Sequence, residues 1–343
     1  MFARNHWYVA ALTGEITGEP LARTVLGDRV VLYRTASGRA VALADRCPHR
    51  RFPLSLGSIS GETLVCGYHG FTFDCEGGCV AVPGQDRVPS RARVRSYPLA
   101  EQGAWTWIWM GDPDRPDRSR LPDVPWLVEG GQWRVLTDMA PLAARVELLM
   151  DNLMDLSHES YLHAGSIGTP EVAETPIETS VDEAAAVVRV DRHIADAACP
   201  AFYSRSTGIE GRIDRWQDIE YFAPGYYLLH SRIAPVGVAP EPDGSDPRGF
   251  HMKISYGLTP STETTSYDFW AVSRDFAGGD AEVDETLAKL QASVVDQDVR
   301  ALDALEERVA ADPDPFEINV RIDRGGLAAR RLVEGLVAAE SAK

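Results

Sequence analysis

The sequence predicts an α+β protein in two domains, an all-β N-terminal domain and a second domain in which helices accompany an antiparallel sheet. The N-terminal part shows short strand-like segments separated by turn residues, such as the alternating run Trp105-Thr106-Trp107-Ile108-Trp109. The later part mixes strand-like segments with only three helical stretches, so its strands follow one another without regular helical crossovers. Between the two parts, GDPDRPDRSRLPDVP carries four prolines and no apolar periodicity, which indicates a linker.

These features place the first domain at residues 1–111, the linker at 112–125 and the second domain at 126–343. A chain of 343 residues is also longer than one typical core supports. The expected helices lie near residues 144–163, 282–310 and 326–340.

Composition restricts the partners and the compartment. The formal net charge of −17 argues against nucleic acid and anionic membranes, which need concentrated Lys and Arg, but permits a basic protein partner. No stretch approaches the roughly 20 consecutive apolar residues of a membrane span, and the start MFARNHWYVAALTGE lacks the apolar run of a signal peptide. We therefore expect a cytoplasmic protein.

Five cysteines, an odd number in a long chain, do not suggest a disulfide framework, so metal binding is the better hypothesis. Cys47-Pro48-His49 is followed, after sixteen residues, by Cys66-Gly67-Tyr68-His69. Zinc sites usually place their histidines together, whereas here each loop supplies one thiolate and one imidazole. That arrangement is what a Rieske [2Fe-2S] cluster needs, with both thiolates on one iron and both imidazoles on the other.

Two further cysteines, Cys75 and Cys79, lie just beyond the second loop. We interpret them as small residues of the glycine-rich turn CEGGC rather than as a second metal pair.

A second group of polar residues lies in VELLMDNLMDLSHESYLHAG, which is apolar nearly all round at helical spacing and so predicts a buried helix. Buried carboxylates and imidazoles are costly unless they are paired or bind metal, yet this segment carries Asn152, Asp155, His158 and His163. On a straight helix the two histidines would lie roughly 140° apart. A local irregularity or a helix break before Ala164 would aim both at one ion, and such distortions are frequent at functional sites.

Two histidines need one carboxylate to complete the facial triad of non-haem iron oxygenases, which leaves positions open for dioxygen. The expected helix at 282–310 offers Asp296, Asp298 and Asp303. Asp298 lies on the centre line of the apolar stripe, whereas Asp296 and Asp303 point about 160° and 140° away. We therefore expect Asp298 to be the third iron ligand, with a buried salt bridge as the alternative. The stripe consists of Leu287, Leu290, Val294, Leu302, Leu305 and Val309.

Nearly the whole chain resembles the Rieske non-haem iron oxygenases of the vanillate O-demethylase type, with dicamba and toluenesulfonate methyl monooxygenases as relatives. The resemblance rests on the stretches WYVA, DRCPHR, LVCGYHGFTFD, MDNLMDLSHESYLHAGSIG, FWAVSRDF and DRGGLAARRLVEGL. It implies a Rieske domain followed by a helix-grip catalytic domain, with Cys47, His49, Cys66 and His69 on the cluster. One departure is Arg50-Arg51-Phe52, where Arg-Gly-Ala is common in the family.

The same resemblance implies roles in the catalytic domain. His158 and His163 bind Fe(II), and Asn152 lies beside the iron. Asp155 hydrogen-bonds a cluster histidine, His69, of the neighbouring subunit, because cluster and iron within one chain are too far apart for efficient electron transfer. A head-to-tail homotrimer follows.

The resemblance further implies the reaction and its partners. Electrons come from NADH through a reductase that carries a flavin and an iron-sulfur cluster. Dioxygen and a methoxy-aryl acid are the substrates, and oxidation of the methyl group gives a hemiacetal that collapses to a phenol and formaldehyde.

The substrate pocket is only weakly indicated by the sequence. Arg232, His230, Tyr256 and Trp270 are polar or aromatic residues on strands that should line the grip, and each has an ordinary role in a strand as its alternative. Two other functional classes remain. A Rieske electron-transfer protein with a non-catalytic second domain predicts no mononuclear iron, and a zinc hydrolase on His158 and His163 lacks the glutamate of H-E-x-x-H.

Overall fold

The computed structural model describes residues 1–128, 130–243, 245–312, 314 and 316–342. Contacts divide the chain into two compact units, Met1–Asp123 with Thr259–Glu263, and Val124–Leu258 with Thr264–Lys343. Residues 112–123, expected in the linker, lie with the first unit, where the Trp7 indole N–H donates to the Asp117 carbonyl at 2.8 Å. Among the described residues, no helix is long and apolar enough to cross a membrane.

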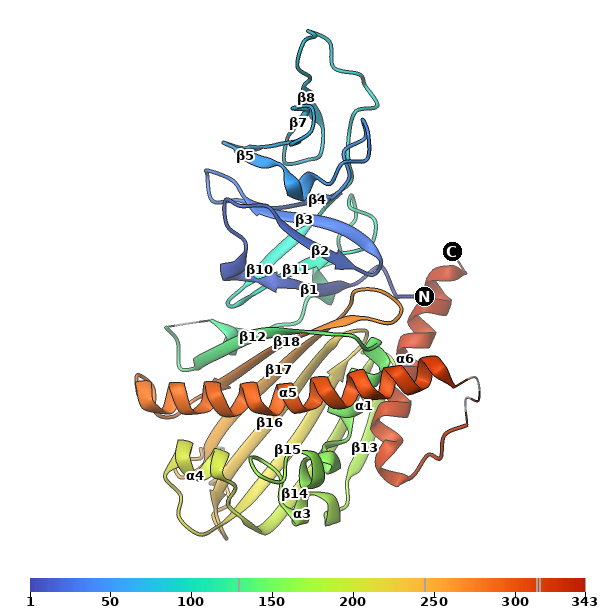
Figure 1. The fold of residues 1–343 in the computed structure, drawn as a ribbon. Helices are drawn as coiled ribbons and strands as arrows, with labels where there is room; N and C mark the ends of the chain where they lie inside the picture. Colours follow the sequence, from blue (N-terminus) through green and yellow to red (C-terminus); the bar gives the residue numbers. More distant parts are fainter. Residues whose placement is uncertain (129, 244, 313, 315, 343) are drawn as a thin grey trace. The chain divides into compact units, whose positions relative to one another are not determined.

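The first unit consists of three small sheets whose paired strands are antiparallel (Figure 1). Helical structure among its described residues is confined to short 3-10 turns, which confirms the predicted all-β character. One sheet contains β1 (Trp7–Leu12), β11 (Trp105–Trp109) and β10 (Leu99–Gln102). The second contains β2 (Leu21–Val25), β3 (Asp28–Arg34), β4 (Ala40–Ala44) and β9 (Ser96–Tyr97), and the third β5 (Ser58–Ser60), β6 (Thr63–Val65), β7 (Thr72–Phe73) and β8 (Cys79–Ala81).

The second unit is built on one seven-stranded sheet in the order β12-β18-β17-β16-β15-β14-β13. Strands β13 to β17 pair antiparallel with their neighbours in sequence, and β12 pairs antiparallel with β18. The bounds are β12 (Arg134–Leu142), β13 (Glu178–Asp182), β14 (Val187–Ala198), β15 (Arg212–Phe222), β16 (Tyr226–Pro235), β17 (Phe250–Pro260) and β18 (Ser266–Arg274).

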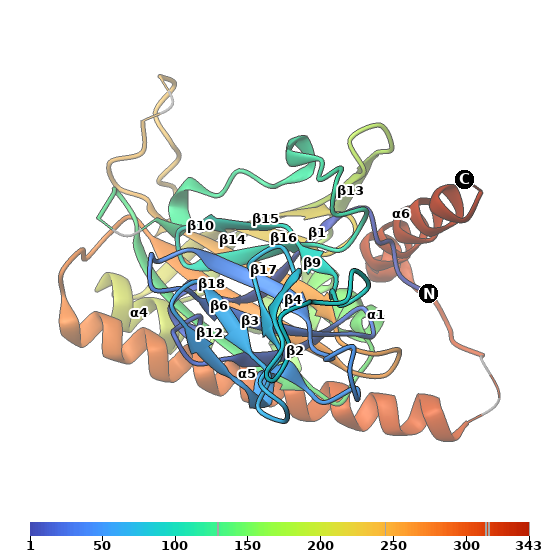
Figure 2. The ribbon, with the colours of Figure 1, turned by 90° about the horizontal axis from the view of Figure 1, so that it is seen from above.

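Helices cover one face of this sheet, and the long helix α5 (Ala281–Ala311) runs along it as a single unbroken element (Figure 1 and Figure 2). Its start is fixed because the Asp280 carboxylate accepts hydrogen bonds from the backbone N–H groups of Glu282 and Val283. The other helices are α1 (Val146–Met154), α2 (Glu159–Leu162), α3 (Pro170–Glu174), α4 (Ala201–Thr207) and α6 (Arg324–Ser341). The α+β fold class predicted from the sequence is confirmed.

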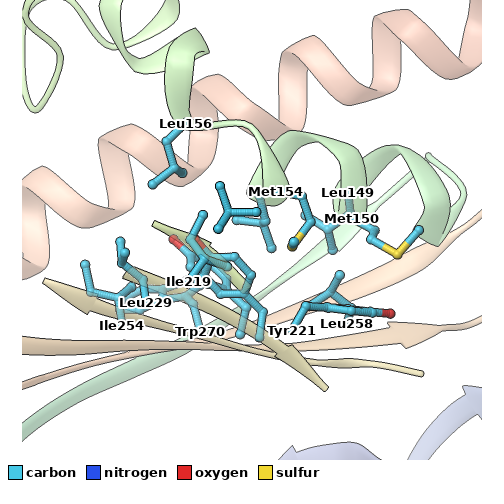
Figure 3. Close-up of a cluster of buried hydrophobic side chains, with 14 of the residues drawn as sticks. Leu149, Met150, Met154, Leu156, Ile219, Tyr221, Leu229, Ile254, Leu258 and Trp270 are labelled. Atoms are coloured by element: carbon cyan, nitrogen blue, oxygen red, sulfur yellow. The ribbon is translucent and has the colours of Figure 1, made fainter. Parts of the chain in front are cut away.

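A hydrophobic core fills the space between these helices and the sheet. Figure 3 shows Leu149, Met150 and Met154 of α1 pointing toward side chains of the strands, among them Ile254 and Trp270. Because side chains alternate along a strand, every second residue joins this core. We call the sheet face that carries Ile219, Tyr221, Leu229, Ile254 and Trp270 the inner face, and the opposite one the outer face.

The stretch expected to be one helix near residues 144–163 is broken, as the positions of its histidines require. Helix α1 ends at Met154, and Asp155 adopts an extended conformation with φ −125° and ψ 93°. A 3-10 turn, Leu156–His158, then leads into the short α2. The predicted irregularity is confirmed, and Asp155 is where it occurs.

Candidate active site

The two Cys-His segments of the first unit fold into loops with the same backbone hydrogen bonds. In the first loop, the Cys47 N–H donates to the Phe52 carbonyl at 2.9 Å, and the Arg51 N–H donates to the Cys47 carbonyl at 2.9 Å. In the second, the Cys66 N–H donates to the Phe71 carbonyl and the Gly70 N–H to the Cys66 carbonyl, at 2.8 and 3.0 Å. The fifth residue of each loop has a left-handed φ, 62° at Arg51 and 71° at Gly70. Two equivalent loops thus present one thiol and one imidazole each.

The donor atoms of these loops suit a two-iron cluster better than a single ion. Both thiols are buried, and burial raises the pKa of Cys47. The His49 and His69 ring centroids lie 4.6 Å apart, and the buried His49 Nδ1 has no hydrogen-bond partner among the described residues. In the described chain, only His158, His163 and Asp298 bring three donor atoms within 4.8 Å of one another. The four donors of the two loops do not form such a group, whereas a single zinc ion would require one.

Cys75 and Cys79 pack in the same core as the two loops but do not join their donor set. The Cys75 thiol donates to the Glu62 carbonyl at 3.3 Å, and the Cys79 thiol to the Ala81 carbonyl at 3.4 Å. Their contacts fit the structural interpretation.

The second unit brings His158, His163 and Asp298 together at the break between α1 and α2. The Asp298 Oδ1 lies 3.2 Å from the His163 Nε2 and 3.7 Å from the His158 Nε2. The two imidazole centroids are 5.1 Å apart. Two imidazole nitrogens and one carboxylate oxygen converging in this way are the donor set of a mononuclear non-haem iron site.

Each of these groups is held from behind by a further hydrogen bond. The His158 Nδ1–H donates to the Asp155 carbonyl at 2.6 Å, and the His163 Nδ1–H donates to the Gln297 Oε1 at 2.7 Å. The Asn152 Nδ2 donates to the Asp298 Oδ1 at 2.8 Å. Such partners fix the tautomer and ring orientation of histidine ligands, so both Nε2 atoms are available to a metal.

His163 and Asp298 form a charge pair whenever the His163 imidazole is protonated. Burial lowers the pKa of His163, but the adjacent Asp298 carboxylate and the Gln297 carbonyl outweigh burial and raise it overall. Protons and a metal ion therefore compete for the His163 Nε2.

Asp155 has a local structural task besides the role that the family resemblance implies. Its carboxylate accepts hydrogen bonds from the Ser157 N–H and hydroxyl, both at 2.9 Å, and so caps the 3-10 turn. The buried Arg192 guanidinium lies 4.0 Å away. Arg145, the partner that a purely structural role would use, instead pairs with Glu306. Asp155 also lines a pocket of about 500 Å³ that continues over Asp151, Glu317, Asp323 and Arg330.

The other two candidate aspartates of α5 lie where the stripe argument expects them, away from the histidines. Asp296 is exposed and pairs with Arg300 one turn later, and Asp303 accepts a hydrogen bond from the Ala143 N–H. The stripe itself departs from expectation near its end. Leu305 is half exposed, whereas the neighbouring Glu306 is buried because Arg145 neutralises it.

The four residues expected near the substrate divide between the two faces of the sheet. Tyr256 and Trp270 belong to the core of the inner face, together with residues of α1. His230 and Arg232 alternate with inner-face residues of β16 and therefore lie on the outer face. There His230 lies 3.1 Å from Glu220, and Arg232 pairs with Asp246 and stacks over the Trp216 ring. His230 and Arg232 are thus paired on the outer face of the sheet, which does not carry the core packed against α1.

Sequence reasoning missed several polar residues of the inner side. Gln297 was not singled out, although it lies next to Asp298. Glu159 is buried and accepts hydrogen bonds from Arg215 at 3.1 Å and from Gln217 at 3.0 Å. Asp268 is buried beside Trp270, and burial, reinforced by Asp298, raises its pKa well above the ordinary value. The alternation of side chains along β15 and β18 could have indicated Arg215, Gln217 and Asp268 only once the inner face was known.

Comparisons with known proteins agree with this geometry. Residues 6–98 match the Rieske [2Fe-2S] domain, and residues 142–339 match the vanillate O-demethylase oxygenase C-terminal domain. The chain is 32% identical to the vanillate O-demethylase oxygenase subunit of Pseudomonas sp. (strain HR199 / DSM 7063), over 99% of this chain and 96% of that protein. It is 36% identical to the oxygenase component of dicamba O-demethylase from Stenotrophomonas maltophilia, over 90% and 89%.

Similarity to solved structures covers the whole chain. A crystal structure of dicamba monooxygenase bound to 3,6-dichlorosalicylic acid superposes with a TM-score of 0.93 at 32% identity, covering 100% of this chain and 99% of that one. The matched domains, the paired Cys-His loops and the two-histidine, one-carboxylate set point to one conclusion: this chain belongs to the Rieske non-haem iron monooxygenases with a vanillate O-demethylase-type catalytic domain.

Proposed function

We propose that the chain is the oxygenase component of a Rieske monooxygenase that O-demethylates a methoxy-aryl acid such as vanillate. The products would be the corresponding phenol and formaldehyde. One observation carries this proposal: His158, His163 and Asp298 converge within 4.8 Å beside an inner sheet face rich in aromatic side chains. Two relatives whose names describe O-demethylation support the choice of reaction.

Cys47, His49, Cys66 and His69 would hold the [2Fe-2S] cluster, and His158, His163 and Asp298 would hold Fe(II). When bound, the iron would supply the activation of dioxygen. The chain's own residues prepare the site: the Asp155 carbonyl and Gln297 hold the two imidazoles in the tautomer that exposes Nε2, and Asn152 orients the Asp298 carboxylate.

Of the four substrate candidates, we retain Tyr256 and Trp270. Both are buried on the inner face, where a bound ring would be shielded from water. The Tyr256 hydroxyl lies 3.2 Å from the Gln291 amide, so it is oriented for a further hydrogen bond. His230 and Arg232 are not retained, since each is paired on the outer face.

We further propose a head-to-tail homotrimer in which Asp155 of one copy accepts the N–H of His69 of the next. His69 is exposed, and Asp155 borders the pocket over Asp151, Glu317 and Asp323, which is predominantly acidic. A pocket of about 690 Å³ beside the first cluster loop is lined by arginines, namely Arg46, Arg50, Arg51 and Arg93. In a chain of net charge −17, this basic surface complements the acidic one and supports their association across copies.

NADH would reach this oxygenase through a flavin and iron-sulfur reductase. We propose the cytoplasm as the compartment, because the five cysteines, all among the described residues, form no disulfide, as is usual in reducing compartments.

The experiment is turnover of a panel of methoxybenzoates with a surrogate reductase, scored by formaldehyde release. Iron and acid-labile sulfide analysis should give about three irons per chain, two in the cluster and one mononuclear. Demethylation of none of the panel, with turnover of another aromatic compound instead, would favour the alternative of a hydroxylase or demethylase of another aromatic substrate in the same family, which is compatible with 32% identity. A cluster without mononuclear iron would indicate an electron-transfer protein.

A further inference from the structure

Asp268 stands out among the buried polar residues that the proposed function does not use. It lies on β18, two residues before Trp270, and only 3% of its surface is exposed. It pairs across the sheet with Ala140, which packs against the inner core, so its side chain also belongs to the inner face. Its Oδ1 has no hydrogen-bond partner among the described residues.

Among the described residues, Asp268 forms no ion pair with a cation that would explain its burial. The charged group that acts on its pKa is another carboxylate, Asp298, which adds to the effect of burial. Asp268 in turn contributes to raising the pKa of Tyr256, which places it near both the iron ligand and the retained substrate residue. Asp268 therefore lies on the inner face without a hydrogen-bond partner for its Oδ1 among the described residues.

A second buried polar atom in this region, the Tyr227 hydroxyl, also lacks a hydrogen-bond partner among the described residues. It is fully buried on β16. The Tyr227 ring meets the Tyr256 ring edge to face, with centroids 5.6 Å apart. Strands β16, β17 and β18 are neighbours in the sheet, so these polar groups form one region of the inner face.

Leaving a buried carboxyl without a partner destabilises a fold, and native proteins rarely tolerate it without a functional reason. A bound molecule that brings its own hydrogen-bond donor removes the penalty. We infer that Asp268 determines substrate specificity by accepting a hydrogen bond from a hydroxyl or amino substituent on the aromatic ring. This inference rests on the proposed function and narrows its substrate class.

The charge of the site fixes the orientation of that substrate. A ring carboxylate bound beside Asp268 would also lie near the Asp298 carboxylate, and like charges repel, so the acid end of the substrate lies elsewhere. The preferred substrate is therefore a methoxy-aryl compound with a separate hydroxyl or amino group. Between 4-hydroxy-3-methoxybenzoate and 3-methoxybenzoate, the first is the better ligand.

The test measures anaerobic binding of these two compounds to the iron-loaded holoenzyme by titration calorimetry. The parent should bind the hydroxylated ring about tenfold or more tightly. Asp268→Leu should abolish this preference, and Asp268→Asn, which keeps one acceptor oxygen, should reduce it at least about threefold. Asp218→Asn removes a carboxylate from the outer face of β15 and serves as the matched control, with the parental preference retained.

Thermal unfolding without ligand gives an independent readout. Removing an unpartnered buried carboxyl should raise the Tm of Asp268→Leu by about 2–4 °C, whereas loss of a structural contact would lower it. If Asp268→Leu does not fold, the substrate preference of Asp268→Asn decides the inference.

Four binding results would overturn the inference: binding of neither compound, equal binding by the parent, an unchanged preference in Asp268→Leu, or an unchanged preference in Asp268→Asn. Formaldehyde release by the parent tests the proposed reaction separately. An Asp268-dependent preference without formaldehyde would refute only the demethylation, and demethylation with an unchanged preference would refute only the role of Asp268.

Discussion

At the scale of single residues, Arg51 occupies a conformation that glycine adopts more easily. Its φ of 62° matches that of Gly70 at the equivalent position of the second cluster loop. A left-handed conformation costs a residue with a Cβ about 1–2 kcal/mol. Glycine would therefore fit this position of the first loop better than arginine.

Arg51→Gly should stabilise the holoprotein by about 1 kcal/mol, because it relieves this strain. Differential scanning calorimetry should show a Tm about 2–4 °C higher and a slower loss of cluster absorbance on heating. Arg50→Gly removes the same charge at a residue whose φ is not positive and should give no such gain. Equal effects of the two substitutions would show that charge, rather than backbone strain, is responsible.

Asp298 and Asp296 provide a second test at this scale, because they lie close in sequence but point in different directions. Asp298→Ala should reduce the iron content from about three to about two per chain and abolish turnover, with the Rieske spectrum retained. Asp296 is exposed and paired with Arg300, an interaction worth about 0.3–0.5 kcal/mol, so Asp296→Ala should be nearly silent. The reverse pattern would move the ligand to Asp296.

At the scale of secondary structure elements, the site depends on a broken helix facing an unbroken one. The break at Asp155 turns His158 and His163 toward each other, and α5 supplies both the Asp298 carboxylate and the Gln297 amide that orients His163. Gln297→Leu retains the approximate size but removes the acceptor for the His163 Nδ1–H. Mononuclear iron affinity should fall by about 10- to 100-fold, measured by chelator competition, with no change in the cluster spectrum. An unchanged affinity would show that packing alone holds the His163 ring.

Iron retention should also depend on pH, and the sign follows from His163. Its pKa is raised by Asp298 after burial has opposed the shift. In the apoprotein, the stabilisation from this pair is complete below the ordinary histidine pKa of about 6.5 and is lost as pH rises through the raised value. Iron needs the neutral imidazole, so its affinity changes in the opposite direction and falls as pH drops through the raised pKa. Dialysis against a weak chelator across this range should release mononuclear iron at the acidic end, and pH-independent retention would contradict the charge pair.

At the scale of the whole molecule, Asp155 tests the proposed electron route between subunits. Asp155→Asn preserves the cap of the 3-10 turn, since asparagine and aspartate cap equally well. The buried Arg192, 4.0 Å from Asp155, keeps the attraction of Glu159, and Arg145 pairs with Glu306 instead. Both metal sites should stay loaded and the Tm should change little, whereas turnover should drop by about 10- to 100-fold or more. Single-turnover reduction of the mononuclear site should slow in parallel. A destabilised variant that still transfers electrons at the parental rate would exclude the bridge.

Local spacing was enough to predict much of this protein. The two Cys-His loops, the helix irregularity before Ala164 and the orientation of Asp298 on its helix depend on neighbours within a few turns of chain, so the sequence determined them. The sequence did not indicate that Glu306, rather than its neighbour Leu305, is buried on α5. The burial of Glu306 depends on Arg145, which is 161 residues distant.

Tertiary structure alone decided which side of the sheet faces the iron. A shift of one residue along a strand moves every side chain to the other face, and both faces of this sheet carry polar and aromatic residues. The sequence therefore could not separate Arg232 from Trp270 as substrate candidates. In the structure, Arg232 pairs with Asp246 on the outer face, whereas Trp270 packs in the inner core. The same ambiguity concealed Asp268, whose lack of a partner depends on what surrounds it in space and not on its neighbours in the chain.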